Sequence, residues 1–232
     1  MASTETRTAL IVGASRGLGH ALAAEFFDRG WNVIGTVRDT GARTLLHDLA
    51  DRSGGRVSVE QLDINEPDQL APLHECLPRL DLLFINAGTT NNPHTPIGEV
   101  STADFIDVMV TNALSPLRVI EALEDLVAPD GLIGAMSSGQ GSITNNTQGM
   151  REVYRGSKAA LNMFMRSFAA RQAETGRALV LMAPGWIRTG LGGEDAPYTM
   201  DETVPLIADV LLSKLGRPGL EYLDRFGKTV PW

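Results

Sequence analysis

The chain has 232 residues, of which 43% are hydrophobic and 21% charged, and its formal net charge is −8 at pH 7. These values are ordinary for a globular protein, and an acidic chain without a basic cluster is unsuited to nucleic-acid binding. The single cysteine excludes a disulfide framework, and the four scattered histidines lack metal-ligand spacing, so no metal site is predicted. Because the N-terminal segment is polar and no apolar run could span a bilayer, we expect a cytoplasmic protein without a membrane partner.

Short apolar runs alternate with amphipathic segments along the chain. The predicted strands cover residues 8–12, 32–37, 56–61, 80–85, 132–136 and 178–182. The predicted helices cover residues 18–29, 40–52, 66–77, 101–127, 153–175 and 201–215. Strands that alternate with helices form βαβ units, so the sequence predicts an α/β fold with a doubly wound, mostly parallel sheet of about seven strands and helices on both faces. No linker or repeat interrupts residues 1–232, which predicts a single domain.

The first predicted strand runs directly into a glycine-rich turn that precedes a helix. The turn contains Gly13, Ser15, Arg16, Gly17, Leu18 and Gly19. Small residues let the backbone turn tightly and approach a pyrophosphate, whose charge is stabilised by the amides at the helix N-terminus. The order strand, glycine turn, helix therefore predicts a dinucleotide-binding turn, although the glycine spacing differs from the usual G-x-G-x-x-G.

The residues after the second strand indicate which dinucleotide binds. A carboxylate there bonds the adenosine ribose, whereas a basic residue suits a 2′-phosphate. Arg38 follows the strand, and Arg16 in the glycine turn can reach the same region, so two guanidinium groups are available for one phosphate. Asp39 is a competing signal. The charge pattern favours NADP(H), with NAD(H) as the alternative.

Tyr154 and Lys158 lie four residues apart at the start of the predicted helix 153–175, so a phenol and an ammonium group share one helical face. A free tyrosine has a pKa of about 10 and is a poor proton shuttle at neutral pH. A nearby cation favours the phenolate and makes the phenol more useful as an acid or base. The pair is therefore a candidate proton-transfer centre.

Four separated elements occur in one order: the glycine turn, Asn86-Ala87-Gly88, Ser137-Ser138, and Tyr154 with Lys158. In this order they closely resemble the short-chain dehydrogenase/reductase family, a group of Rossmann-fold enzymes, and the resemblance covers nearly the whole chain. Asn112 matches the asparagine of the family's catalytic tetrad, and Pro184-Gly185 matches its turn after the sixth strand. The segment around Tyr154 and the C-terminal residues 226–232 are similar to the sniffer and C-factor type of carbonyl reductase.

The resemblance implies that a hydride passes between a nicotinamide and a carbonyl or carbinol carbon. Tyr154 would protonate the carbonyl oxygen, Ser138 would orient that oxygen, and Lys158 would lower the tyrosine pKa and bond the nicotinamide ribose. Asn112 would hold a water that links Lys158 to solvent. The implied function is NADP(H)-dependent reduction of a small or lipophilic aldehyde or ketone. The alternatives are an NAD-dependent alcohol dehydrogenase and a non-catalytic dinucleotide-binding signalling protein.

The resemblance also implies further cofactor contacts. Asp63 and Ile64, which follow the third strand, would lie at the adenine, and Asn86, Ala87 and Gly88 would line the cofactor cleft. After the sixth strand, the implied cofactor-binding residues are Pro184, Gly185, Ile187 and Thr189.

Two positions and one spacing depart from the family pattern. Val12 and Ile85 stand where the family often has threonine and asparagine, and because they end neighbouring strands, an apolar pair is expected to replace a polar pair. The gap from Ser138 to Tyr154, 154 − 138 = 16 residues, is wider than the family usually shows. Ser142 is therefore a rival to Ser138 for the catalytic hydroxyl, and Ser137 is a weaker one.

The substrate itself is not identified by the sequence. Residues 190–204 correspond to the family's substrate loop, and their glycines permit movement. The predicted apolar wall of the pocket consists of Trp186, Met150, Tyr198 and Met200, and the candidate carboxylate anchors are Arg151 and Arg188. Relatives often pair through the helices predicted here at 101–127 and 153–175, which implies a homodimer or homotetramer. Its apolar seam would comprise Ala113, Leu117, Ala160, Phe164 and Phe168, unless these face the sheet.

Overall fold

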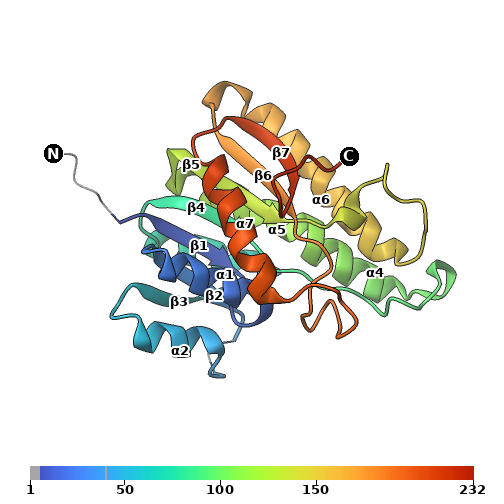
Figure 1. Ribbon diagram of the computed structural model, residues 1–232, viewed down its shortest axis with the longest axis horizontal. Coiled ribbons are helices and arrows are strands. Elements are labelled where there is room, and N and C mark those ends of the chain that lie inside the picture. Colours follow the sequence, from blue (N-terminus) through green and yellow to red (C-terminus); the bar gives the residue numbers. More distant parts are fainter. Residues whose placement is uncertain (1–5, 40) are drawn as a thin grey trace.

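In the computed structural model, which describes residues 6–39 and 41–232, seven strands form one sheet (Figure 1). In chain order they are β1 (Thr8–Val12), β2 (Asn32–Val37), β3 (Val57–Gln61), β4 (Leu80–Ile85), β5 (Val127–Met136), β6 (Ala178–Ala183) and β7 (Gly219–Asp224). Their order in the sheet is β3-β2-β1-β4-β5-β6-β7, and each neighbouring pair is parallel. The predicted α/β architecture is confirmed, with a sheet that is entirely parallel.

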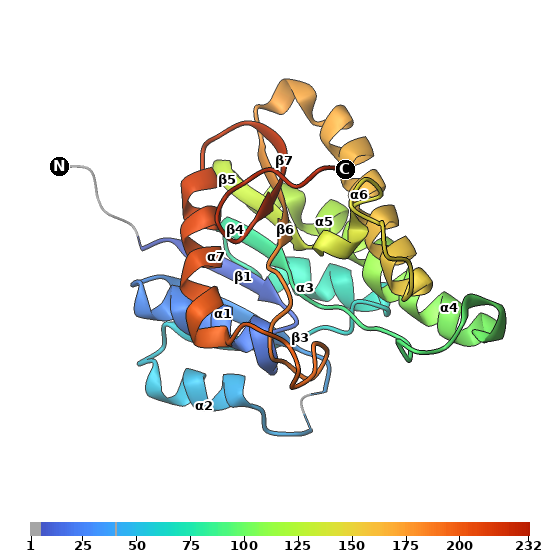
Figure 2. The ribbon, with the colours of Figure 1, turned by 45° about the vertical axis from the view of Figure 1, so that its right-hand side comes forward.

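Helices cover both faces of this sheet (Figures 1 and 2). One layer contains α1 (Gly17–Asp28), α2 (Leu45–Arg52) and α7 (Met200–Lys214). The other contains α3 (Leu70–Cys76), α4 (Thr102–Met109), α5 (Ser115–Leu123) and α6 (Glu152–Arg171). Short 3₁₀ turns occupy Pro67–Gln69, Ile97–Glu99, Glu124–Leu126, Gly139–Gly141 and Ala173–Thr175. Each layer buries its own apolar core against the sheet, as expected for a parallel sheet that is shielded on both sides.

The predicted helix 101–127 is helical in the structure from Thr102 to Leu126, but it is not a regular α-helix throughout. Helix α4 ends at Met109, a π-helical turn named η3 (Val110–Leu114) follows, and α5 begins only at Ser115. Strand β5 then begins at Val127, earlier than the predicted start at 132. A π-helical turn is set by tertiary contacts and is commonly found at functional sites, and this one carries Asn112.

Two other helices differ at their starts. Helix α2 begins at Leu45, where Thr44 and His47 form a capping box, and Thr40 of the predicted 40–52 helix lies outside the described residues. The predicted helix 66–77 divides into a 3₁₀ turn at Pro67–Gln69 and α3. The predicted apolar pair is confirmed, because Val12 stands opposite Ile85 in the sheet and both are buried.

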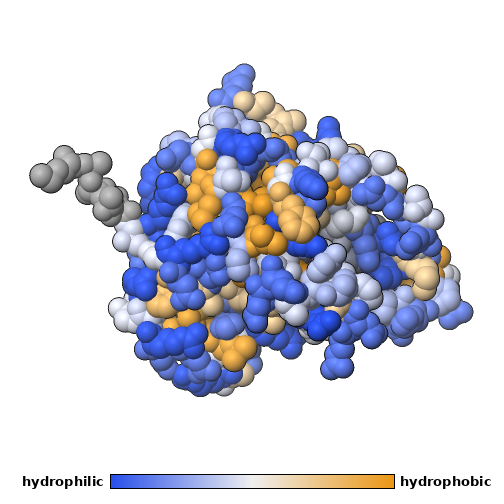
Figure 3. Space-filling model, in the orientation of Figure 1, coloured by the Kyte–Doolittle hydropathy of each residue, from blue (hydrophilic) through white to orange (hydrophobic). Residues whose placement is uncertain are grey.

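The proposed dimer seam is only partly available at the surface. Ala113, Leu117 and Phe168 are buried in the core, so they face the sheet, whereas Phe164 is exposed. Other large apolar side chains are exposed on α4, η3 and α6, namely Phe105, Ile106, Leu114 and Met163. The face drawn in Figure 3 is mostly hydrophilic, with hydrophobic residues in separate areas. Within residues 6–39 and 41–232, no helix combines the length and apolar character that a membrane span requires.

Candidate active site

The carboxyl ends of the strands open onto a cleft of about 790 Å³. The cleft lies where the strand order reverses: β1 is flanked by β2 on one side and by β4 on the other. Open parallel sheets bind ligands at this switch point, because the loops that leave the two halves diverge there. The segments that follow β1 to β6 all contribute to the cleft wall.

Most of the predicted site residues line this one cleft. They are Gly13, Ser15, Arg16, Gly17, Leu18, Arg38, Asp63, Ile64, Asn86, Ala87, Gly88, Ser138, Tyr154, Lys158, Pro184, Gly185, Ile187 and Thr189. Gly19 and Asn112 do not line the cleft. Polar wall residues that the sequence reasoning missed include Thr36, Asn65, Thr89, Thr90, Asp107, Thr111 and Gln140. In the sequence, only their places near a strand end or in a helix beside the cleft could have indicated these residues, and that signal is weak.

The glycine turn fits close packing around a phosphate-binding backbone. Gly13 has a φ of +85°, and a Cβ there would lie 2.9 Å from Ala87. A Cβ on Gly19 would lie only 2.1 Å from the carbonyl oxygen of Gly13. Space therefore requires glycine at both positions, and the backbone conformation requires it at Gly13 as well.

The N-terminus of α1 is free to receive an anion. Helix α1 begins at Gly17 on the cleft wall, and its N-cap residue Arg16 makes no side-chain cap. The first turn also contains no acidic residue. The uncapped amides and the positive end of the helix dipole therefore suit the pyrophosphate of a dinucleotide.

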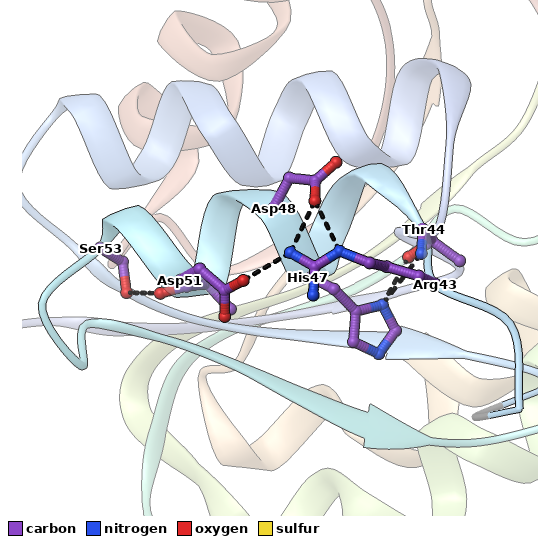
Figure 4. Close-up of polar contacts among 7 residues, drawn as sticks. Arg43, Thr44, His47, Asp48, Asp51 and Ser53 are labelled. Carbon is purple, nitrogen blue, oxygen red and sulfur yellow. Dashed lines mark hydrogen bonds and ion pairs between the residues drawn. The ribbon is translucent and has the colours of Figure 1, made fainter.

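A second hollow of about 540 Å³ adjoins the cleft beyond the end of β2. Arg16 and Arg38 line both spaces, and no described carboxylate forms an ion pair with either guanidinium. Arg43 differs, because Asp48 and Asp51 hold its guanidinium (Figure 4).

The competing carboxylate near Arg38 is engaged elsewhere. Asp39 lines only the second hollow, and its Oδ1 accepts a hydrogen bond of 2.7 Å from the backbone N–H of Gly41. Arg16 and Arg38 therefore present two guanidinium groups at the end of β2, an arrangement that suits a phosphate better than a ribose hydroxyl.

Tyr154 and Ser138 meet at the inner part of the cleft. Helix α6 supplies the tyrosine, the segment that follows β5 supplies the serine, and both residues line the cleft. Burial raises the pKa of Tyr154, while the Ser138 side chain and the charge of Arg151 act in the opposite direction. The phenol therefore keeps its proton at neutral pH and can donate it to an oxygen atom placed between these two groups.

Lys158 is buried one turn further along α6. Its Nζ donates a hydrogen bond of 2.9 Å to the Met136 carbonyl and lies 5.9 Å from the centre of the Tyr154 ring. Burial lowers the pKa of Lys158 from 10.5 to about 8. Lys158 is expected to lower the pKa of Tyr154, but it is not among the groups that do so. The groups that counteract the effect of burial on this pKa are Ser138 and Arg151.

The buried ammonium predicts a specific pH dependence of stability. Because the pKa of Lys158 is lower in the folded chain than in the unfolded chain, the unfolded chain binds more protons between the two values. Stability should therefore rise with pH across the window from about 8 to 10.5. Between about pH 7 and pH 9.5 the free energy of unfolding without nucleotide should rise by roughly 2 kcal/mol more in the wild type than in Lys158→Met.

Urea unfolding of both proteins at several pH values measures this difference. Comparing the slopes cancels the cost of the Met136 carbonyl that the substitution leaves without its partner. Parallel pH curves for the two proteins would contradict the lowered pKa.

Asn112 braces the loop after β4. Its Oδ1 accepts a 2.8 Å hydrogen bond from the Thr89 N–H, and its Nδ2 donates to the Thr89 carbonyl at 2.8 Å. The second Nδ2 proton goes to the Ser157 hydroxyl at 2.9 Å, on the inner face of α6. Both amide protons are thus used. Through these hydrogen bonds, Asn112 connects α6 to Thr89, the residue that follows Gly88 on the cleft wall.

The three nearby serine hydroxyls have different surroundings. Ser142 does not line the cleft, and its Oγ lies 3.4 Å from the Trp232 carbonyl and accepts the Asn145 N–H. Ser137 donates a hydrogen bond of 2.6 Å to Asn162. Ser138 lines the cleft and its side chain acts on the pKa of Tyr154, whereas Ser142 lies off the cleft, so the structure favours Ser138 over this rival.

The segment predicted as a substrate loop is shorter than expected. Residues 200–204 of the predicted loop belong to α7, so the loop itself ends at Thr199. The loop is internally braced, since Trp186 Nε1 donates to the Gly192 carbonyl at 2.7 Å. Of the predicted apolar wall, only Trp186 lines the cleft; Met150, Tyr198 and Met200 lie off it. Of the two candidate carboxylate anchors, Arg151 lines the cleft and Arg188 does not.

Comparisons with known proteins agree with this arrangement. The sequence model of the family described as short chain dehydrogenase matches residues 7–197. A crystal structure of a protein described as a short-chain dehydrogenase/reductase from Burkholderia multivorans, with bound NADP, is 61% identical, with a TM-score of 0.96 over 98% of this chain and 100% of that one. The carbonyl reductase Sniffer of D. melanogaster is 25% identical, with a TM-score of 0.87 over the same shares. C-signal of Myxococcus xanthus is 34% identical over 68% of this chain and 95% of its own length.

Proposed function

This chain belongs to the short-chain dehydrogenase/reductase family, and on that premise we propose that it reduces a small or lipophilic aldehyde or ketone with NADPH. The observation that carries the proposal is that Ser138, Tyr154 and Lys158 line the same cleft, with Tyr154 and Lys158 one turn apart on α6. The similarity to C-signal and Sniffer supports the predicted resemblance to that branch of the family.

NADPH, when bound, supplies the hydride, and the chain supplies position and a proton. The α1 amides and the glycine turn would hold the pyrophosphate, and Arg16 with Arg38 would hold the 2′-phosphate. Asp63 and Ile64 would contact the adenine, while residues 86–88 and 184–189 would line the nicotinamide half of the cleft. The NADP bound to the Burkholderia multivorans protein supports this choice of cofactor.

The proton would follow a short path at the substrate oxygen. The Ser138 hydroxyl would orient the carbonyl oxygen, and the Tyr154 hydroxyl would donate its proton as negative charge develops there. The buried Lys158 ammonium would stabilise the resulting phenolate and bond the nicotinamide ribose. Asn112 would act through Thr89 and Ser157, which keep α6 and the cleft wall in register.

Consumption of NADPH with benzaldehyde as the carbonyl substrate tests this function. We expect kcat/KM to be about tenfold or more higher with NADPH than with NADH, because two cations face the 2′-phosphate site. Faster oxidation of benzyl alcohol with NAD⁺ would instead favour the dehydrogenase alternative. Tight NADPH binding without turnover on a panel of aldehydes and ketones would favour a non-catalytic dinucleotide-binding protein.

A further inference from the structure

Arg151 places a cation on the cleft wall that the proposed reaction does not use. Its guanidinium carbon lies 4.9 Å from the centre of the Tyr154 ring. Its Nε is buried and has no hydrogen-bond partner, and no ion pair joins the side chain to a carboxylate in residues 6–39 and 41–232. A guanidinium group with a buried, unsatisfied donor is costly unless a ligand completes its bonds.

The backbone at this position is strained in a way that holds the side chain over the tyrosine. Met150 and Arg151 have φ values of 60° and 58°, which are unusual for residues other than glycine. Left-handed conformations of this kind cost roughly 1–2 kcal/mol per residue. Hydrogen bonds from Arg155 fix them: its Nε donates to the Met150 carbonyl at 2.8 Å, and its N–H donates to the Arg151 carbonyl at 2.9 Å. Strain that the surroundings enforce is typical of functional positions.

The local charges leave Arg151 free to bind an anion. It is the N-cap of α6, a 20-residue helix, so the positive end of the helix dipole adds to its charge. The carboxylates on the cleft wall, Asp63 and Asp107, belong to the segment after β3 and to α4, and neither pairs with Arg151. Glu152 is exposed in the first turn of α6 and does not line the cleft.

We propose that Arg151 binds a carboxylate group of the substrate, so that the chain acts preferentially on carbonyl compounds that carry a negative charge, such as oxo acids and carboxylated aldehydes. This inference rests on the proposed function and assigns its substrate class. A planar guanidinium can bond both oxygens of a carboxylate, and its place beside Tyr154 sets the charged group near the reacting carbonyl.

The test compares acids with uncharged partners of similar shape. The substrates are 2-, 3- and 4-carboxybenzaldehyde and the methyl ester of each, reduced with saturating NADPH. We expect the wild type to prefer at least one acid over its ester by about tenfold or more in kcat/KM, the discrimination expected of one charge-assisted hydrogen-bonded contact. An effect of Arg151 on the acidity of Tyr154 changes kcat/KM for the acid and for its ester alike. The ratio of the two kcat/KM values therefore cancels that effect.

Three variants separate recognition from structure. Arg151→Asn removes the cation but suits a left-handed N-cap, so folding should be retained, and the preference for the acid should disappear. Arg151→Lys keeps the charge and should keep part of the preference. Arg118→Gln removes an exposed arginine from α5, away from the cleft, and should leave the preference unchanged. An equal loss for acid and ester in Arg151→Asn, or a wild type that prefers the esters, would overturn the proposal.

A binding measurement keeps this inference separate from the proposed function. Calorimetric titration of the NADP⁺-loaded protein with benzoate and with benzamide needs no turnover. We expect benzoate to bind about tenfold or more tightly than benzamide, and Arg151→Asn to remove the difference. If none of the aldehydes is reduced and benzoate is still selected through Arg151, the proposed function fails and the anion site stands. If the aldehydes are reduced and benzoate is not selected, the anion site fails alone.

Discussion

Tyr154→Phe should lower kcat for aldehyde reduction by about 10²- to 10⁴-fold, the range for loss of a general acid. The substitution removes one oxygen atom from a buried ring and leaves the packing of α6 intact. The dissociation constant of NADPH should therefore change by less than about threefold, because the proposed phosphate contacts come from the glycine turn and Arg38 and not from this hydroxyl. Steady-state kinetics and quenching of tryptophan fluorescence by NADPH measure the two quantities.

Two serine variants serve as matched controls for this prediction. Ser138→Ala removes the hydroxyl that would orient the substrate oxygen beside Tyr154 and should also lower kcat strongly, by about 10²-fold. Ser142→Ala alters a hydroxyl that faces the C-terminal Trp232 carbonyl and should have little effect on kcat. Turnover that survives in Tyr154→Phe, or that depends on Ser142 and not on Ser138, would refute the proposed proton path.

Arg38→Ala should weaken NADPH binding by about 10- to 100-fold and leave NADH binding nearly unchanged. The guanidinium has no carboxylate partner in the described chain, so its charge is available to the 2′-phosphate that distinguishes the two cofactors. The expected size follows from the loss of one charge-assisted contact of roughly 1.5–3 kcal/mol. Fluorescence titration with both cofactors gives the ratio directly.

Arg52→Ala is the control for the loss of one positive charge in this region. Arg52 is exposed in the last turn of α2, whereas the second hollow is lined from the first turn of that helix. It should leave the ratio of NADPH to NADH affinity unchanged. An equal loss of both cofactors in Arg38→Ala would assign Arg38 a structural role, and a gain for NADH would point to Asp39 as a ribose ligand.

The burial of Lys158 links the stability of the protein to the proposed reaction. Its ammonium group is buried, and burial lowers its pKa to about 8. It donates a hydrogen bond to the Met136 carbonyl. A buried cation in this position destabilises the protein at neutral pH, yet in the proposed reaction it would stabilise a tyrosinate during turnover. The stability cost and the proposed use would then have the same origin, the low polarity around the Lys158 ammonium.

The sequence was sufficient for those features that depend on neighbours in the chain. The bounds of β1, β2 and β4 follow from short apolar runs between turn residues, and the glycine turn after β1 follows from residue size and order. The place of Tyr154 and Lys158 on one face follows from a spacing of four residues in a helix. Family resemblance, rather than periodicity, gathered Asn86, Ser138 and Pro184 into the same site.

Tertiary structure decided what depends on contacts between distant segments. A π-helical turn at Asn112 lies within a segment whose apolar pattern predicts one regular α-helix, and Asn112 bonds both Thr89 and Ser157 from it. The choice of Ser138 over Ser142 depends on which hydroxyl faces the cleft and which faces the C-terminus. The free guanidinium of Arg151 is visible only when every possible partner has a position in space. Local pattern fixes which residues share an element, whereas burial and pairing of charges depend on the packing of all elements together.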